Sequence, residues 1–241
     1  MLTDEWLTIT AFCDRRRESL QRAQNLGFAI ALDNIGTAYS SLANLRDLPI
    51  DMIKLDQSFA RSLNEHPENL QFALSLLSLA RGLGKRMVVE GVETADIQDA
   101  LRVLGVDYGQ GYAVARPMTP EALGPWISGR GVRNRGRRPR SMLGAYAGHL
   151  LVVETCRNLM NQPLQITWKE EAKDPHACAI GQYFDHNGLH ETTCGHAHKR
   201  FHEVLDRYES DRPTWETAAR GFHDELIAAI RKLGVKDACP G

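Results

Sequence analysis

The stretch LDNIGTAYSSLANLRDLPIDMIKLDQSF, residues 32–59, carries most of the information about the fold of this chain. It takes in the end of one short apolar run, FAIALD (28–33), and the whole of a second, DMIKLD (51–56), and both runs end on an aspartate. A third run, KRMVVEGVE (85–93), follows a segment whose apolar residues have helical spacing, at positions 70–83. Short apolar runs that alternate with helical patterns predict an α/β fold with a parallel sheet.

Polar residues stand where the expected strands end. Ligands of parallel α/β folds bind beyond the carboxyl ends of the strands, and four such ends supply Asp33, Lys54 with Asp56, Glu90, and Gln110. Converging carboxylates repel one another unless cations lie among them, so they suit hard divalent metals such as Mg²⁺. Two such ions can activate water and stabilise a leaving oxygen in phosphodiester hydrolysis. Taken one at a time, the same residues could instead cap strands or form ion pairs.

Three motifs occur in a fixed order: residues 32–59, then VVEGVET (88–94), then GQGYAVARPM (109–118). This order resembles the C-terminal half of an EAL domain, a bacterial family that hydrolyses cyclic di-GMP to its linear dinucleotide. The matching family patterns are LDDFGTGYSSL with LKID, then AEGVET, then QGY followed by a proline. Three ordered motifs over roughly 120 residues are specific where one alone would not be. The resemblance implies a partial (β/α) barrel with two metal ions at the strand ends.

The resemblance also implies a role for each matching residue. Asp33, Asp56 and Glu90 would ligate Mg²⁺ or Mn²⁺, and Glu90, Lys54 and Asp56 would be the catalytic set. Lys54 would lie beside the nucleophilic water, which Asp56 could orient, and Glu90 would complete the metal-and-base group. Gln110 would contact the substrate, cyclic di-GMP. Glu93, the second carboxylate of the VVEGVET motif, would support the neighbouring loop.

Several positions depart from the family pattern. The paired aspartates become Asp33 and Asn34, and a neutral amide binds a divalent cation less strongly than a carboxylate does. Ile35 and Ala38 replace Phe and Gly, and Asp4 is the nearest counterpart of a glutamate in an earlier family motif. A complete barrel takes about 250 residues. We therefore expect a fragment, a dimer that closes the sheet or a decayed remnant, with little catalysis by this truncated chain.

An arginine-rich segment, SGRGVRNRGRRPRS (128–141), divides the chain. Its glycines, its proline and its near absence of apolar residues predict a linker between a truncated EAL-type domain (1–127) and a second domain (142–241). A patch for anionic lipid or nucleic acid is the alternative, but the net charge of −1 favours a solvated tether.

The second domain has a histidine-rich pattern that predicts a zinc site. His198 and His202 lie four residues apart, on one face of an expected helix, and Cys178 and His149 could complete a tetrahedral Zn²⁺ set. A last helix over 214–233, with one apolar stripe, would close a small all-α bundle. The pattern is similar to the CZB family, zinc-binding bundles attached to bacterial chemoreceptors and diguanylate cyclases. Rival ligands, each next to a favoured one, are His176, Cys194 and His196.

Composition narrows the classes of function further. The 241 residues carry 29 Lys and Arg against 30 Asp and Glu, which argues against DNA or an anionic membrane as partner of the whole molecule. No run reaches the roughly 18 apolar residues of a membrane span. Five cysteines, an odd number, do not suggest a disulfide framework and favour a reducing cytoplasm.

Together, the two halves predict a bacterial cyclic di-GMP phosphodiesterase that is coupled to zinc. One alternative is a non-catalytic, zinc-responsive regulator whose first half binds a nucleotide or a partner. Another is a defunct product whose zinc bundle still folds. We also expect a homodimer, because CZB relatives commonly act as dimers and because an open half-barrel leaves strand edges uncovered.

Overall fold

The computed structural model describes residues 17–35, 46, 48–130, 137–159, 173–207 and 210–237. Asp4 and Ala38, and the side chain of Asn34, lie outside this description, so the expectations about them stay predictions. Within the described ranges, every helix falls short of the length and apolarity that crossing a membrane requires.

The sheet has four parallel strands in sequential order, β1-β2-β3-β4. Their bounds are β1 Ala31–Ile35, β2 Met52–Leu55, β3 Arg86–Glu90 and β4 Tyr108–Gln110. Ile53 and Leu55 are fully buried on one face of β2, while Lys54 between them points to the other face and is only half-buried. The predicted α/β fold with a parallel sheet is therefore confirmed, whereas the partial (β/α) barrel stays a prediction.

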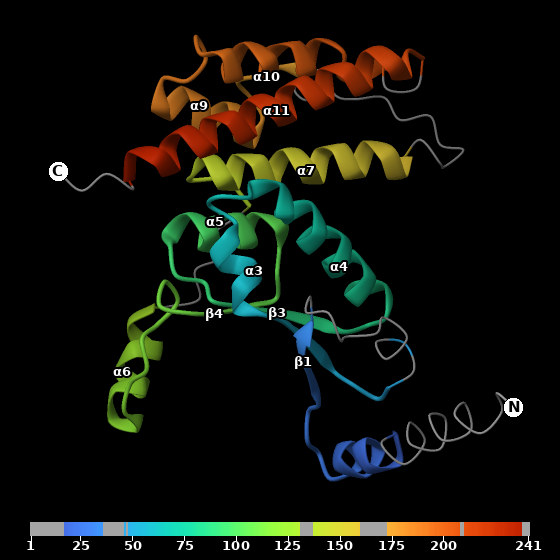
Figure 1. Ribbon diagram of the computed structural model, residues 1–241, viewed down its shortest axis with the longest axis vertical. Coiled ribbons are helices and arrows are strands. Elements are labelled where there is room, and N and C mark those ends of the chain that lie inside the picture. The colour runs from blue at the N-terminus through green and yellow to red at the C-terminus, as the bar shows by residue number, and fades with distance from the viewer. Residues whose placement is uncertain are drawn as a thin grey trace, which may run out of the picture.

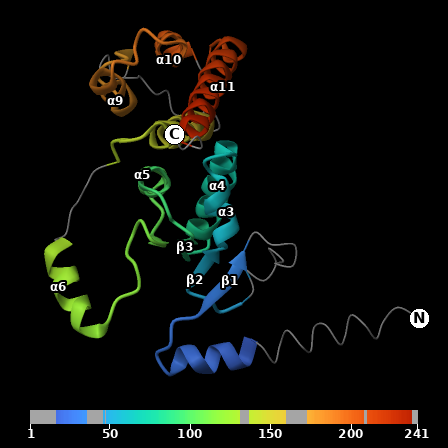
Figure 2. The ribbon, with the colours of Figure 1, turned by 60° about the vertical axis from the view of Figure 1, so that its left-hand side comes forward.

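Helices follow the strands as the alternating pattern predicts. They are α3 Gln57–Ser62, the short 3₁₀ helix η1 Pro67–Asn69, α4 Leu70–Gly82, α5 Ala95–Leu104 and α6 Pro120–Arg130. Helices α3, α4 and α5 lie between the sheet and the C-terminal helices (Figure 1). A helical segment at residues 17–25 lies at the end of the molecule opposite the C-terminal helices (Figure 2). The covered face of the sheet is thus the one that buries its aliphatic side chains.

Helix α4 forms over the segment with helical spacing, but not all of its apolar residues are buried. Phe72 and Leu79 are 49% and 40% exposed. The buried positions are Leu70, Ala73, Leu74, Leu76, Leu77 and Ala80. This helix contacts β3 on one side and a C-terminal helix on another, so it needs a wider buried face than a single stripe supplies.

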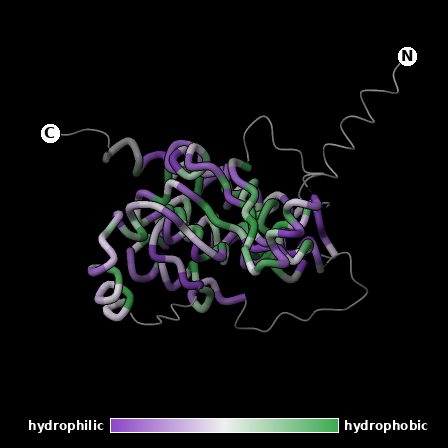
Figure 3. Tube along the Cα trace, turned by 90° about the horizontal axis from the view of Figure 1, so that it is seen from below, coloured by the Kyte–Doolittle hydropathy of each residue, from purple (hydrophilic) through white to green (hydrophobic). Residues whose placement is uncertain are grey.

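The C-terminal region folds into helices that we call the helical layer. They are α7 Met142–Leu159, α9 Ala179–Asn187, α10 Thr193–Glu203, the 3₁₀ helix η2 Leu205–Arg207 and α11 Arg212–Asp237. The predicted stripe of α11 is buried at Trp215, Ala219, Phe222, Leu226 and Ile230, whereas Leu233 is 48% exposed. Hydrophobic stretches run through the middle of the molecule, while hydrophilic ones lie mostly at its periphery (Figure 3).

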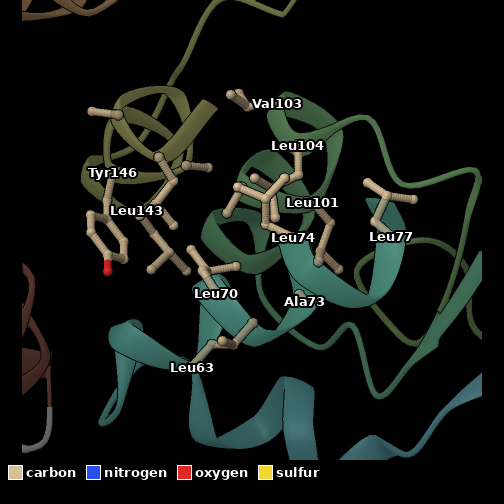
Figure 4. Packing of buried hydrophobic residues seen from close by; sticks show 14 of the residues in the cluster. Leu63, Leu70, Ala73, Leu74, Leu77, Leu101, Val103, Leu104, Leu143 and Tyr146 are labelled. Carbon is tan, nitrogen blue, oxygen red and sulfur yellow. The ribbon is translucent and has the colours of Figure 1, made fainter. Parts of the chain in front are cut away.

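The helical layer packs directly on the α/β part. Leu143 and Tyr146 of α7 lie beside Leu70 and Leu74 of α4, and beside Leu101 of α5 (Figure 4). These residues belong to one continuous apolar core that includes residues of the sheet. The domain boundaries at 127 and 142 stay predictions about the sequence, and the apolar packing joins both sides of them.

A buried aspartate fixes this contact between the two parts. Asp99 of α5 is 6% exposed, and its Oδ2 accepts hydrogen bonds from the backbone N–H groups of Arg140 and Ser141, at 2.7 and 3.1 Å. Ser141 Oγ in turn accepts from the N–H of Gly144 at 2.9 Å, in the first turn of α7. The end of the arginine-rich segment is therefore bonded to α5 where the structure describes it.

Candidate functional site

Three of the predicted strand-end residues come together on the sheet. Lys54 Nζ of β2 lies 2.5 Å from Glu90 Oε1 of β3 and 3.5 Å from Asp33 Oδ2 of β1. Lys54 is the register partner of Val88, so Glu90 lies two residues further along the same face of the neighbouring strand. The parallel register thus brings one ammonium group and two carboxylates to a single edge of the sheet.

The charge of Lys54 determines the electrostatics of this strand-end cluster. The hydrogen bond to Glu90 raises the pKa of Lys54 above its usual value, and its side chain is 23% exposed. A lysine in this state stays protonated and does not serve as a base. Its fixed positive charge offsets the repulsion between Asp33 and Glu90.

Asp56 and Gln110 lie near the cluster but have other contacts. Asp56 is the N-cap of α3 and accepts a hydrogen bond from the N–H of Ser58 at 2.8 Å. Hydrogen bonds from Ser58 lower the pKa of Asp56, so this carboxylate stays ionised. Gln110 is the register partner of Glu90 and is exposed, and its backbone carbonyl accepts from the N–H of Val92 at 3.0 Å.

Two glycines explain why the VVEGVET and GQGY motifs keep their spacing. Gly91 has a φ of +71°, and a Cβ there would lie 2.8 Å from Cβ of Gln57 at the start of α3. A Cβ on Gly111, with a φ of +157°, would collide with the backbone of Val92. The loops after β3 and β4 therefore pack on each other and on α3. Glu93 also ties its loop to α3 through an ion pair with Arg61 at 2.8 Å.

The strand-end cluster fits a hard divalent cation in part. Asp33 and Glu90 supply the carboxylate oxygens that Mg²⁺ and Mn²⁺ prefer, and both lie close to one point, at Lys54 Nζ. Asp56 is engaged in capping α3. Among the described residues, the groups of three or more ligand side chains with atoms within 4.8 Å of one another lie in the C-terminal region instead.

One of those groups contains three of the four predicted zinc ligands. Cys178 Sγ lies 3.3 Å from His198 Nε2, which lies 3.1 Å from His202 Nε2. Cys178 caps the N-terminus of α9, and the two histidines lie one turn apart on α10. All three belong to one group of converging ligand atoms in which both histidines are buried.

The protonation states of this buried site suit a soft metal ligand set. Burial lowers the pKa of His198 to about 3, so its imidazole is neutral and can donate a lone pair. Burial also raises the pKa of the Cys178 thiol, which a bound metal ion would deprotonate. One sulfur and two imidazole nitrogens match the ligands of Zn²⁺.

His149 is not part of this converging group. Its Nε2 donates a hydrogen bond to the carbonyl of Ala219 at 3.1 Å, and its ring lies 4.7 Å from that of Phe222, which in turn lies 5.0 Å from the ring of His198. Its Nδ1 is buried without a hydrogen-bond partner among the described residues. The predicted fourth ligand therefore shares the core with the other three, but the structure does not bring it to them.

The rival ligands fall in three different places. Cys194 is buried on α10 outside the group, and His196 is exposed, 3.7 Å from Glu191. His176 belongs to a second group, with Asp185 and His190. Sequence reasoning missed that group, although the three residues lie within fifteen positions of one another on either side of, and within, α9.

Comparisons with known proteins support the reading of the α/β part. Residues 3–117 match the family model described as the EAL domain. A cyclic di-GMP phosphodiesterase of Pseudomonas aeruginosa is 48% identical over 108 residues, which are 45% of this chain and 18% of that protein. The cyclic di-GMP phosphodiesterase RocR of the same organism is 38% identical over 112 residues, which are 46% of this chain and 29% of that protein.

The solved EAL domain of Mycobacterium smegmatis DcpA is 32% identical, with a TM-score of 0.44, over 47% of this chain and 51% of that one. The chain spans less than a third of the length of the two curated relatives. The strand-end cluster lies within the matched residues, and the helical layer lies beyond them. Residues 3–117, slightly less than half of this chain, thus match the EAL domain family model.

Proposed function

We propose that this chain is a cyclic di-GMP signalling protein in which an incomplete EAL phosphodiesterase module is coupled to a zinc-responsive helical domain similar to CZB. The phosphodiesterase part of the proposal rests on one observation. Asp33, Lys54 and Glu90 form a cluster on adjacent strands within the segment that matches the EAL domain model. The relatives named as cyclic di-GMP phosphodiesterases share this segment.

The proposed chemistry follows from the charges at the strand ends. Asp33 and Glu90 would hold Mg²⁺ or Mn²⁺, which activates water for attack on a phosphodiester. The ammonium group of Lys54 would offset the negative charge of cyclic di-GMP, and exposed Gln110 would contact the substrate. Asp56, ionised beside the cluster, would orient water. The amide of Asn34 would weaken a second metal ion.

The proposed zinc site uses Cys178, His198 and His202, with His149 as a fourth ligand after a change of its side-chain rotamer. Helix α7 supplies a route from this site to the strand ends. It packs on α5, and α5 begins five residues after Glu90, where Thr94 accepts a hydrogen bond from the N–H of Ile97 at 3.3 Å. A shift of α7 on binding zinc would therefore be passed to the loop that follows Glu90.

A non-catalytic, zinc-responsive regulator is the second candidate. The observation that favours it is the engagement of the expected metal ligands: Asp56 caps α3, and Lys54 bridges Asp33 and Glu90. Such a protein would bind cyclic di-GMP or a partner protein without turnover. A homodimer suits either candidate, and sedimentation of the purified chain tests it.

The deciding experiment measures hydrolysis and binding of cyclic di-GMP by the chain in Mn²⁺, with zinc added or removed. The same measurements are made on a chimera in which the N-terminal half of an EAL domain is fused ahead of residue 1. Turnover that Glu90→Gln abolishes and Glu93→Gln spares would support the enzyme. Binding without turnover, in the chimera also, would support the regulator, and absence of both would overturn the cyclic di-GMP assignment.

A further inference from the structure

We propose a second metal site, formed by His176, Asp185 and His190, that takes a divalent transition-metal ion such as Zn²⁺ or Co²⁺. It is separate from the Cys178 site and shares no ligand with it. The two imidazole nitrogens and the carboxylate oxygen lie within 4.8 Å of one another. Imidazole ligands favour transition metals over Mg²⁺ or Ca²⁺, and a mixed histidine and carboxylate set is common for zinc.

The geometry of the three side chains carries the proposal. His176 Nδ1 lies 2.8 Å from Asp185 Oδ1, and His190 Nε2 lies 2.7 Å from the same oxygen. The second contact lacks the angle of a hydrogen bond, and His190 Nε2 is shielded from solvent with no other partner among the described residues. His176 Nδ1 donates a hydrogen bond to Asp185 Oδ1, whereas His190 Nε2 is buried beside the same carboxylate without one. This unsatisfied nitrogen would gain a partner from a bound cation.

The two rings and the carboxylate are held in place by the backbone. The centroids of the His176 and His190 rings are 4.1 Å apart, with 32° between their planes, so both rings present an edge to Asp185. The N–H of His176 donates to Asp174 Oδ1 at 2.8 Å, which fixes the turn before α9. The hydrogen bond from His176 also lowers the pKa of Asp185 and keeps it ionised.

Two glycines let the turns that carry the histidines lie close to the helices. A Cβ on Gly181 would collide with the carbonyl of Pro175, next to His176. A Cβ on Gly195 would collide with the carbonyl of His190 itself. Both glycines lie in the first turns of their helices, α9 and α10, where glycine has low helix propensity. Glycine is therefore required at these two positions because the turns that carry His176 and His190 lie too close for a Cβ atom.

The second site differs from the first in its access to solvent. The side chains of His176 and Asp185 are 58% and 46% exposed, so water can fill the remaining coordination positions, as at open zinc sites. Phe184 separates the two sites, with its ring 6.0 Å from that of His190 and 5.3 Å from that of His198. The open site should bind more weakly and exchange metal faster than the buried one.

Metal titration of the full chain tests the proposal. Zinc is measured per chain in buffers of set free Zn²⁺, and Co²⁺ is titrated in parallel, because only a thiolate ligand gives sulfur-to-cobalt charge-transfer absorption. We expect two zinc equivalents, the weaker of which is lost or weakened at least tenfold by Asp185→Asn and by His190→Gln. Both variants should keep the charge-transfer band. His196→Gln, an exposed histidine beside Glu191, is the matched control.

The outcomes separate this site from the one proposed above. Two independent sites would be supported if Asp185→Asn lost the weaker zinc equivalent and kept the charge-transfer band. Cys178→Ser should then lose the band and keep the weaker equivalent. Failure of the Cys178 site would abolish the band and leave the Asp185-dependent binding intact. Equal binding by wild type and Asp185→Asn, or equal loss in the His196 control, would overturn the second site. His176→Gln, at an exposed position, serves if the other variants unfold.

Discussion

The strand-end cluster and the buried site of the helical layer hold their polar groups in opposite ways. At the strand ends, charged carboxylates lie near solvent and a lysine compensates them. In the helical layer, a half-buried thiol and a buried, neutral imidazole lie close to each other and without an opposite charge. The first arrangement is stable as it stands, whereas the second gains most from a bound cation. A bound metal ion should therefore change the chemistry of the strand-end cluster. In the helical layer, it should instead change the free energy of unfolding.

Removal of zinc should give the largest effect. With free zinc held at 1,000 times the Kd, binding stabilises the folded state by about 4 kcal/mol. For a chain of this size, that corresponds to roughly 8–16 °C in Tm. Thermal unfolding of the full chain in zinc and in chelator measures the difference, which Cys178→Ser should reduce to the smaller contribution of the weaker site at Asp185. Cys194→Ser, a buried cysteine on α10 outside the group, should keep it. An equal Tm in zinc and chelator would remove the contrast between the two regions.

Asp99→Asn should have the next largest effect, because it weakens the joint between the two regions. The carboxylate is buried and receives hydrogen bonds from Arg102 and from the backbone of Arg140 and Ser141. Loss of its charge should cost about 1.5–3 kcal/mol, the range for hydrogen bonds to charged groups. Denaturant unfolding measures it. Glu154→Gln, which removes only the charge from an exposed acceptor of a hydrogen bond from Ser78 of α4, should cost less than about 1 kcal/mol. Similar losses in the free energy of unfolding for both variants would mean that Asp99 does not hold the two regions together.

The strand-end residues were predictable because a local rule governs them. In a parallel sheet, residues at the ends of successive strands meet at one edge, so short motifs locate Asp33, Lys54 and Glu90 without knowledge of distant contacts. The stripe of α11 was predictable for a similar reason, since one long helix buries one face. Asp56 was found as well, but the sequence did not show that its carboxylate caps α3, because capping and metal binding use the same residue type.

The rest depended on contacts that leave little trace in the sequence. Residues 137–141 look like a solvated segment, yet two of their backbone N–H groups bond to Asp99, and backbone groups have no sequence pattern. The helical spacing at positions 70–83 did not show that Phe72 is exposed, because periodicity does not say how many neighbours a helix has. The group around Asp185 was missed because its histidines lie in turns, where no helical spacing applies.

Lys54→Met tests whether charge compensation holds the strand ends together. Without the ammonium group, Asp33 and Glu90 would repel each other, and a divalent cation would no longer compete with a lysine. Because Asp33 is 53% exposed, solvent reduces the effect to about 1 kcal/mol, which is roughly a fivefold tighter affinity for Mn²⁺. Calorimetric titration with Mn²⁺ measures it. Lys85→Met should leave the affinity unchanged, because Lys85 donates to the carbonyl of Ile50 before β2 and lies just before β3, away from the strand ends. Weaker binding in Lys54→Met would show that this lysine organises the site instead.

Glu93→Gln should have the smallest effect of these changes, and it acts on the free energy of unfolding. Its ion pair with Arg61 joins two side chains that are 41% and 55% exposed, so its loss should cost less than about 1 kcal/mol. Gly91 and Gly111 already fix the loop by close backbone packing, so the loop should keep its position without the pair. Denaturant unfolding at low and high salt checks this, since an exposed pair is screened by salt. If the free energy of unfolding fell by several kcal/mol, the strand-end loops would depend on exposed charges. The stability of the strand-end region would then be as sensitive to single substitutions as that of the helical layer.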